Sequence, residues 1–83
     1  MKELLNYLVS AMVDHPESIT IRESIGQKNT AYIVLVDPED VGKVIGKNGR
    51  IANALRVIMR AAGELQDKAI WVDFNYNRQS NSR

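Results

Sequence analysis

The 83-residue sequence contains no cysteine and only one histidine, His15. The absence of thiols excludes disulfide bonds, a thiolate nucleophile and cysteine metal ligands. His15 precedes Pro16 at the expected end of a helix, which predicts a ring bonded to a carbonyl and leaves no His-based catalytic pair or His-containing metal cluster. The acidic residues are spread over expected caps and turns, so no pair is suited to acid–base catalysis. We therefore predict a protein that is not an enzyme and needs no cofactor, metal or small-molecule substrate.

Long hydrophobic runs are also missing. The apolar stretches fall far short of the roughly 20 residues that cross a membrane, and the start, Met1-Lys2-Glu3, does not resemble a signal peptide. These features predict a cytoplasmic protein without membrane contact. A chain of 83 residues with 45% hydrophobic and 25% charged residues is typical of one small globular domain. We expect this single domain over residues 1–75, followed by a flexible polar tail at 76–83.

Acidic residues are absent from one long window. Between Val41 and Gly63 the chain carries five basic residues and no acidic one, whereas the remainder has six basic and ten acidic residues. The formal net charge of +1 therefore hides a positive segment on an acidic body. A solvated charged face is the ordinary explanation of such a run, but here the charges gather around one glycine loop, which favours a surface that faces an anion. The five basic residues are Lys43, Lys47, Arg50, Arg56 and Arg60.

That loop lies in the stretch from Val44 to Ala52, where two glycines, Gly46 and Gly49, enclose Lys47 and Asn48. A glycine has no Cβ, so the main chain can approach a phosphate closely, and the free N–H groups of the following helix face the same point. The spacing of two glycines is weak evidence by itself. Its position between two helices, inside the basic window, predicts an anion-binding turn.

The first half of the chain predicts a helix and a hairpin. Apolar residues fall on one side of a helix over 2–14, which ends before Pro16. Alternation predicts a half-buried strand over 18–24, and after a turn at 26–29 a second strand follows at 30–36. The short turn predicts antiparallel pairing. The nearly continuous apolar run of the second strand predicts a central position buried on both faces.

The second half predicts two helices and a strand. Asp37 caps a short helix with Pro38 in its first position, and Gly46 ends it. A longer helix over 49–62 is apolar around an unusually wide part of its circumference, and we expect Gly63 to be its C-terminal cap. The last strand covers 68–75. Its Trp71 lies on the less apolar side, where a base-stacking platform, an interface anchor and a ring half-covered by loops all stay open.

The run Val44-Ile45-Gly46-Lys47-Asn48-Gly49, with the apolar Ala52 on the next helix, resembles the signature loop of the KH domain. The order of the expected elements is similar to the type II KH arrangement, and a single domain of this length resembles the small bacterial KhpA-type (YlqC-like) family. The resemblance implies an α+β fold in the order α-β-β-α-α-β, with three helices packed on one face of a three-stranded sheet.

In KH domains the loop clamps the backbone of about four nucleotides while apolar groove residues receive the bases. The resemblance therefore implies a clamp at the glycine loop, an apolar floor and cationic phosphate contacts. The corresponding residues are Gly46, Lys47, Asn48 and Gly49 for the clamp, Val44, Ile45 and Ile51 for the floor, and Lys43, Arg50 and Arg56 for the phosphates.

The resemblance also implies partners and a cellular role. The ligand is expected to be single-stranded RNA, with single-stranded DNA left open. The protein partner is expected to be a second copy or a multidomain KhpB (Jag-like) KH protein. An RNA chaperone or post-transcriptional regulator linked to cell shape and cell-wall homeostasis is implied in the same way.

A second hypothesis needs no nucleic acid. A glycine turn between helices is a common structural device, and the wide apolar stripe of the helix over 49–62 is typical of a subunit contact. The chain would then be a protein–protein interaction subunit, and the loop would only join two helices. The two hypotheses are compatible, since one groove of this size is expected to bind weakly and to gain affinity from a paired domain.

Overall fold

The computed structural model describes residues 1–76. Tyr76, predicted to begin the polar tail, is the last residue of the final strand, and the rest of the predicted tail, 77–83, lies outside the described residues. Its elements follow the predicted order. No helix in this described part is both long enough and apolar enough to cross a membrane. The elements are α1 (Lys2–Ser10), a 3-10 turn (Pro16–Ser18), β1 (Thr20–Ile25), β2 (Asn29–Val36), a 3-10 turn (Pro38–Asp40), α2 (Val41–Ile45), a 3-10 turn (Lys47–Gly49), α3 (Arg50–Glu64) and β3 (Ala69–Tyr76).

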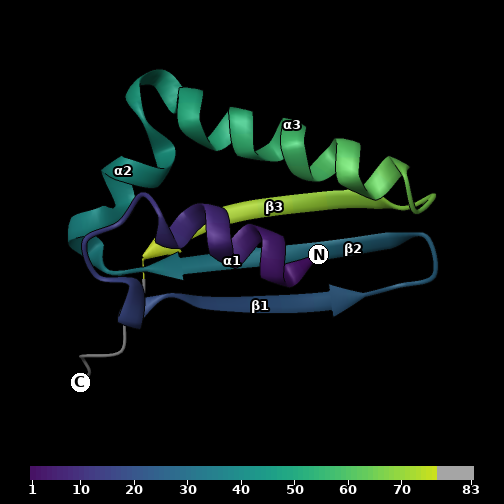
Figure 1. Cartoon of the computed structure of the whole chain (residues 1–83), viewed down its shortest axis with the longest axis horizontal. Helices are drawn as coiled ribbons and strands as arrows, with labels where there is room; N and C mark the ends of the chain where they lie inside the picture. Colours follow the sequence, from purple (N-terminus) through teal and green to yellow (C-terminus); the bar gives the residue numbers. More distant parts are fainter. Residues whose placement is uncertain (77–83) are drawn as a thin grey trace.

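The three strands form one mixed sheet in the order β1-β2-β3 (Figure 1). β1 and β2 pair antiparallel as the short turn predicts, with Arg22 opposite Ile33. β3 pairs parallel with β2 because the chain returns through α2 and α3, and Ile33 is opposite Asp73 in that pair. The central position of β2 is therefore confirmed.

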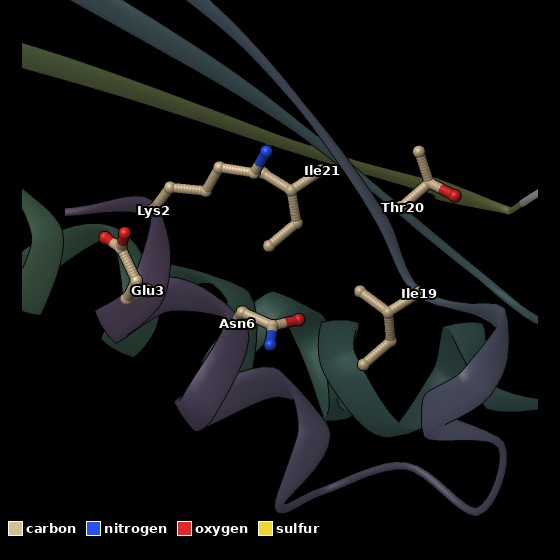
Figure 2. Close-up of a pocket in the computed structure, with 6 residues that line it drawn as sticks. All are labelled: Lys2, Glu3, Asn6, Ile19, Thr20 and Ile21. Atoms are coloured by element: carbon tan, nitrogen blue, oxygen red, sulfur yellow. The ribbon is translucent and has the colours of Figure 1, made fainter.

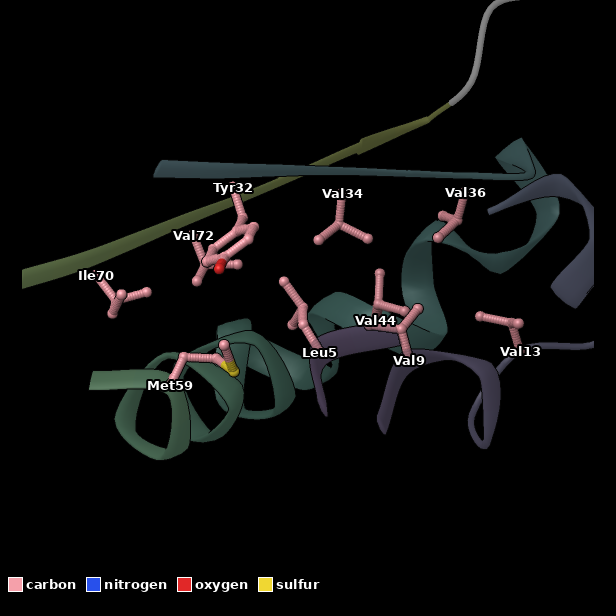
Figure 3. Packing of buried hydrophobic residues seen from close by; sticks show 10 residues of the cluster. All are labelled: Leu5, Val9, Val13, Tyr32, Val34, Val36, Val44, Met59, Ile70 and Val72. Atoms are coloured by element: carbon pink, nitrogen blue, oxygen red, sulfur yellow. The ribbon is translucent and has the colours of Figure 1, made fainter. Parts of the chain in front are cut away.

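All three helices pack on one face of the sheet, as Figure 3 shows for the core side chains between the two layers. The predicted α+β arrangement is confirmed, but burial of β2 on both faces was wrong. Its residues alternate between buried and more exposed positions, because a chain of this length has helices for one face only. The buried apolar core consists of Leu5, Val9, Val13, Tyr32, Val34, Val36, Val44, Met59, Ile70 and Val72.

The predicted helix start at Asp37 is confirmed. Its side-chain oxygen accepts a hydrogen bond from the backbone N–H of Glu39 at 2.9 Å, and Pro38 occupies the first position of the turn. The first turn is 3-10, and the α-helical hydrogen bonding of α2 begins only at Val41. This junction places α2 directly before the glycine loop.

Gly63 does not cap α3, contrary to the prediction. It lies inside the helix and is buried, and a Cβ at this position would lie 2.3 Å from Cγ1 of Ile70 and 2.7 Å from the carbonyl oxygen of Lys68. Glycine at this position therefore allows α3 to approach β3 closely, because it has no side chain. The left-handed residue that follows the helix is Asp67, with φ of 58°.

Asp40 ties the end of the α1 region to the start of α2. Its carboxylate is fully buried and accepts hydrogen bonds from the backbone N–H groups of Asp14 (3.1 Å) and His15 (3.0 Å). Burial opposes ionisation, but these two hydrogen bonds and the charges of His15 and Lys43 outweigh it and lower the pKa of Asp40. The buried carboxylate of Asp40 thus joins the segment that follows α1 to the start of α2.

Candidate nucleic-acid interface

The glycine loop between α2 and α3 has a left-handed backbone at three positions. Gly46 and Gly49 have φ of 77° and 75°, and Asn48 has φ of 57°. A Cβ at Gly46 would also lie 2.6 Å from Cγ1 of Ile51, so only glycine fits there. At Gly49 a Cβ would meet nothing closer than 3.9 Å, so the requirement there is conformational. The turn therefore needs glycine at both ends, for different reasons.

Part of the loop backbone is already hydrogen-bonded. The N–H of Gly49 donates to the carbonyl of Gly46 at 3.1 Å, and the N–H of Arg50 donates to the carbonyl of Lys47. In the described part of the chain, the N–H groups of Lys47 and Asn48 have no backbone acceptor. Donors left open at a turn without bulky side chains can receive a phosphate oxygen.

The cations around the loop differ in their partners. Within residues 1–76, the exposed side chains of Lys47 and Arg50 form no ion pair or hydrogen bond. Lys43, predicted as a phosphate contact, is ion-paired with Asp14 and lies 3.6 Å from Asp40. Its hydrogen bond to Asp14 raises the pKa of Lys43. The charge available to a ligand is therefore concentrated on Lys47 and Arg50.

α3 runs from the loop along the outer edge of β3 (Figure 1). A groove of about 570 Å³ lies there, lined by Arg56, Arg60 and residues of β3 that include Trp71 and Asp73. The outer edge of β3 has no strand partner among the described residues, so its peptide groups border the groove. The groove joins a cationic helix face to the exposed edge of a sheet.

Arg56 is held in this groove. Its Nε donates to the carbonyl of Val72 at 2.9 Å, its Nη1 donates to Oδ1 of Asn53 at 3.0 Å, and its guanidinium carbon lies 5.6 Å from the ring centre of Phe74. The guanidinium thus covers one carbonyl at the open edge of β3. Its Nη2 remains available for an anion. The phosphate contact of Arg56 stays a prediction, and this nitrogen is the atom that would make it.

The predicted apolar floor is only partly at the surface. Val44 is fully buried in the core, and this corrects its assignment as a floor residue, because a buried side chain cannot touch a ligand. Ile45 is half-buried and Ile51 is partly exposed beside the loop. Val44 therefore supports the floor, and Ile45 and Ile51 remain candidates to contact bases.

Sequence reasoning missed Arg60 and the edge of β3 as groove residues. The signal for Arg60 was present, because a residue four positions after Arg56 lies on the same face of a helix. No local pattern indicates which edge of which strand α3 will follow, because that depends on the parallel pairing of β3 with β2.

A second hollow lies between α1 and β1 (Figure 2). Its volume is about 480 Å³, and its walls bring together Lys2 and Glu3 with the polar Asn6 and Thr20. The opposite charges of Lys2 and Glu3 leave this hollow without a net positive charge. It therefore lacks the electrostatic character of the loop and of the α3–β3 groove.

The structure corrects the expectation that no His-containing group of ligand atoms is available. His15, Asp37 and Glu39 each present a ligand atom within 4.8 Å of the others, because the end of the α1 region folds against the start of α2. These groups already bond within the cluster: Nε2 of His15 lies 3.2 Å from Oε1 of Glu39.

The hydrogen bond to Glu39 raises the pKa of His15, partial burial opposes the shift, and the charges of Asp37, Asp40 and Glu17 add to it.

We expect NMR titration of the His15 ring to give a pKa above the ordinary 6.5, and Glu39→Gln to return it towards 6.5. Because the folded pKa is the higher one, the stabilisation is present below about pH 6.5 and is lost as the pH rises through the folded pKa. Thermal unfolding of wild type and His15→Gln between about pH 5.5 and 8.5 checks this sign. A ring that titrates at or below 6.5 would contradict the assignment.

The helix-strand-strand-helix-helix-strand order, the mixed sheet and the glycine loop between α2 and α3 define the class of this protein as a KH domain of type II. The family described as "KhpA/KhpB, KH domain" matches residues 2–74. The chain belongs to this KhpA/KhpB family of KH domains.

Individual relatives agree with the family match. The chain is 44% identical over 73 residues to the RNA-binding protein KhpA of Oceanobacillus iheyensis, covering 88% of this chain and 97% of the relative. It is 41% identical to the protein of the same name from Clostridium perfringens, with the same coverage, and 43% identical over 70 residues to that of Listeria monocytogenes, covering 84% of this chain and 92% of the relative. No solved structure gave a significant match.

Proposed function

We propose that this chain binds single-stranded RNA at the glycine loop and the α3–β3 groove. The observation that carries the proposal is the loop itself, a turn with left-handed glycines at both ends, open N–H donors and the unpartnered cations Lys47 and Arg50. Relatives at 41–44% identity are named RNA-binding proteins, which supports the same ligand here. The proposed function is binding alone, without a catalytic step.

In this proposal the sugar–phosphate backbone crosses the clamp of Gly46, Lys47, Asn48 and Gly49. The bare main chain allows close approach, while the side chains of Lys47 and Arg50 attract the phosphates. The bases then point towards Ile45, Ile51 and the open edge of β3, whose peptide groups can pair with base edges. Further contacts come from Nη2 of Arg56 and from Arg60. Lys43 contributes only after it exchanges its carboxylate partners for a phosphate.

The test is an NMR titration of the whole protein with pools of short single-stranded RNA and DNA. We expect shift changes at residues 43–56 and along the outer edge of β3, and the two pools compare RNA with DNA directly. Absence of any shift would reject this function. Shifts confined to the hollow between α1 and β1 would reject the groove assignment.

A second candidate function, a protein-interaction subunit, is favoured by the outer side of α3. A row of apolar side chains lies on the solvent side of this helix, away from Arg56 and Arg60, and Ile58 in its middle is 43% exposed. Such a row in water favours a subunit contact. We propose that it pairs this chain with a second copy or with a multidomain KhpB (Jag-like) protein. The row, named the α3 stripe below, consists of Ala54, Ile58, Ala61 and Leu65.

Ile58→Asp is expected to weaken self-association at least about tenfold, because it places a charge in the middle of the α3 stripe. Sedimentation equilibrium over a range of concentrations measures the change. Ile25→Asp, which makes the same replacement at an exposed position of β1, is the matched control. A wild-type protein that stays monomeric at high concentration would contradict a homodimer through α3.

The proposed cellular role follows only from the resemblance to the KhpA-type family. A weak single-stranded RNA groove on a pairing domain suits an RNA chaperone or a post-transcriptional regulator acting in the cytoplasm. A link to cell shape and cell-wall homeostasis belongs to the same proposal. Loss of RNA binding and loss of pairing can be tested separately, since Lys47 lies in the glycine loop and Ile58 lies in the middle of α3.

A further inference from the structure

The face of the sheet that the helices leave open carries a second apolar surface. Figure 3 shows Tyr32, Val34 and Val72 pointing towards the helices, so the residues between them point the other way. On this open face Trp71 is 65% exposed and Ile33 is 42% exposed.

The strand register arranges the open face in three rows across β1, β2 and β3. In the middle row Ile33 is flanked by Arg22 on β1 and Asp73 on β3. Among residues 1–76 neither Arg22 nor Asp73 has a hydrogen-bond or ion-pair partner. The row on one side is Ser24, Ala31 and Trp71, and the row on the other side is Thr20, Leu35 and Asn75.

We propose that this open face packs against the same face of a second copy, with a two-fold axis that runs parallel to β2 past Ile33. Such an axis exchanges the two edges of the sheet and keeps each row in place. Arg22 of each copy then faces Asp73 of the other, and Ile33 faces its own counterpart. The contact therefore contains two opposite-charge pairs around an apolar centre.

The shapes of the side chains agree with the same axis. The large Trp71 of one copy lies over the small Ser24 of the other, and Leu35 faces Leu35. A two-fold axis across the strands would place Arg22 over Arg22 and Asp73 over Asp73, and like charges facing each other are unfavourable. Charge and size thus select one arrangement of the two sheets, which is the aligned type seen in sandwiches.

A second copy fits this face better than nucleic acid does. The three rows carry one cation and one anion, so this face has no net attraction for a polyanion, whereas the α3–β3 groove, which Trp71 and Asp73 also border, holds Arg56 and Arg60 in addition. Three strands spaced about 4.8 Å apart, with a rise of about 3.3 Å per residue, form a small face. We therefore expect a weak contact that is measured at concentrations up to about 1 mM. It is distinct from the α3 stripe, which lies on the helical layer.

The test uses Arg22→Asp and Asp73→Arg, each in a protein that also carries Ile58→Asp to block the α3 stripe. Each charge variant alone faces like charges at both pairs, so we expect its self-association to weaken at least about tenfold. Mixing the two variants restores opposite charges at both pairs. We expect the mixture to form a mixed dimer with an affinity within about threefold of that of the Ile58→Asp parent. Sedimentation equilibrium, with one variant fluorescently labelled, measures the association of the parent, of each charge variant and of their mixture.

The mixing experiment separates this contact from an effect on folding, because both variants must be folded to associate. An Ile33→Asp variant removes the apolar centre and is expected to be monomeric in the same background. Unchanged association of the single variants, or a mixture no tighter than either variant alone, would overturn the proposal. Loss of RNA binding in Ile33→Asp without any change in association would also overturn it and would assign the face to nucleic acid.

Discussion

Replacing Lys47 and Asn48 together by Asp is expected to lower the affinity for single-stranded RNA at least about 30-fold at moderate salt. The substitutions change the charge of the clamp from positive to negative at the point where the main chain is most accessible. Fluorescence anisotropy with a short labelled RNA measures the loss. The affinity of the variant is expected to depend less steeply on salt concentration than that of the wild type, by the amount that about one phosphate contact contributes.

The same double substitution is expected to leave the thermal midpoint nearly unchanged. Lys47 and Asn48 are exposed, and neither side chain forms a hydrogen bond or ion pair within residues 1–76. Asn48 has a left-handed backbone, with φ of 57°, which Asp tolerates almost as well. A loss of binding therefore reports on the ligand surface and not on folding.

The matched control is Gln27→Asp with Lys28→Asp. It makes the same total change of charge at exposed positions in the β1–β2 turn, at the opposite end of the long axis from the loop (Figure 1). We expect this control to reduce RNA affinity much less than the loop variant does, because the molecule is 39 Å long along this axis and the Debye length at moderate salt is only about 10 Å. Equal affinities of the two double variants would reject the loop as the binding site.

Gly63→Ala is expected to destabilise the protein by about 2–4 kcal/mol, although alanine normally favours a helix by up to about 1 kcal/mol over glycine. The added Cβ would lie 2.3 Å from Cγ1 of Ile70 and 2.7 Å from the backbone oxygen of Lys68. A side chain can rotate away, but the carbonyl is part of the chain that leads into β3. We expect the thermal midpoint to fall by about 10 °C or more in a domain of this size.

Gly42→Ala is the control for this prediction. Gly42 also lies in a helix, but a Cβ there would meet nothing within 4 Å. We expect a gain of about 0.5–1 kcal/mol, because alanine lowers the conformational entropy of the unfolded chain. Destabilisation of both variants by similar amounts would contradict the role of Gly63 in helix–sheet packing. Thermal and urea unfolding followed by circular dichroism measure both.

Local sequence signals predicted the elements that carry the candidate site. The start of α2 depends on Asp37 and Pro38, and its end depends on Gly46, so neighbours along the chain were sufficient. The glycine loop was recognised for the same reason, since its left-handed residues are determined within four positions. The roles of Val44 and Gly63 were misassigned, because burial and close approach depend on distant strands and helices.

The sequence by itself therefore determined the order of helices and strands, the glycine turn and the positive charge around it. Each of these depends on backbone preferences and charges of residues close in sequence. Only the tertiary structure decided that the helices cover one face of the sheet, that Lys43 is paired with acids, that Arg56 covers the edge of β3, and that Trp71 lies on the open face. These features come from contacts between segments far apart in the chain, which no local pattern specifies.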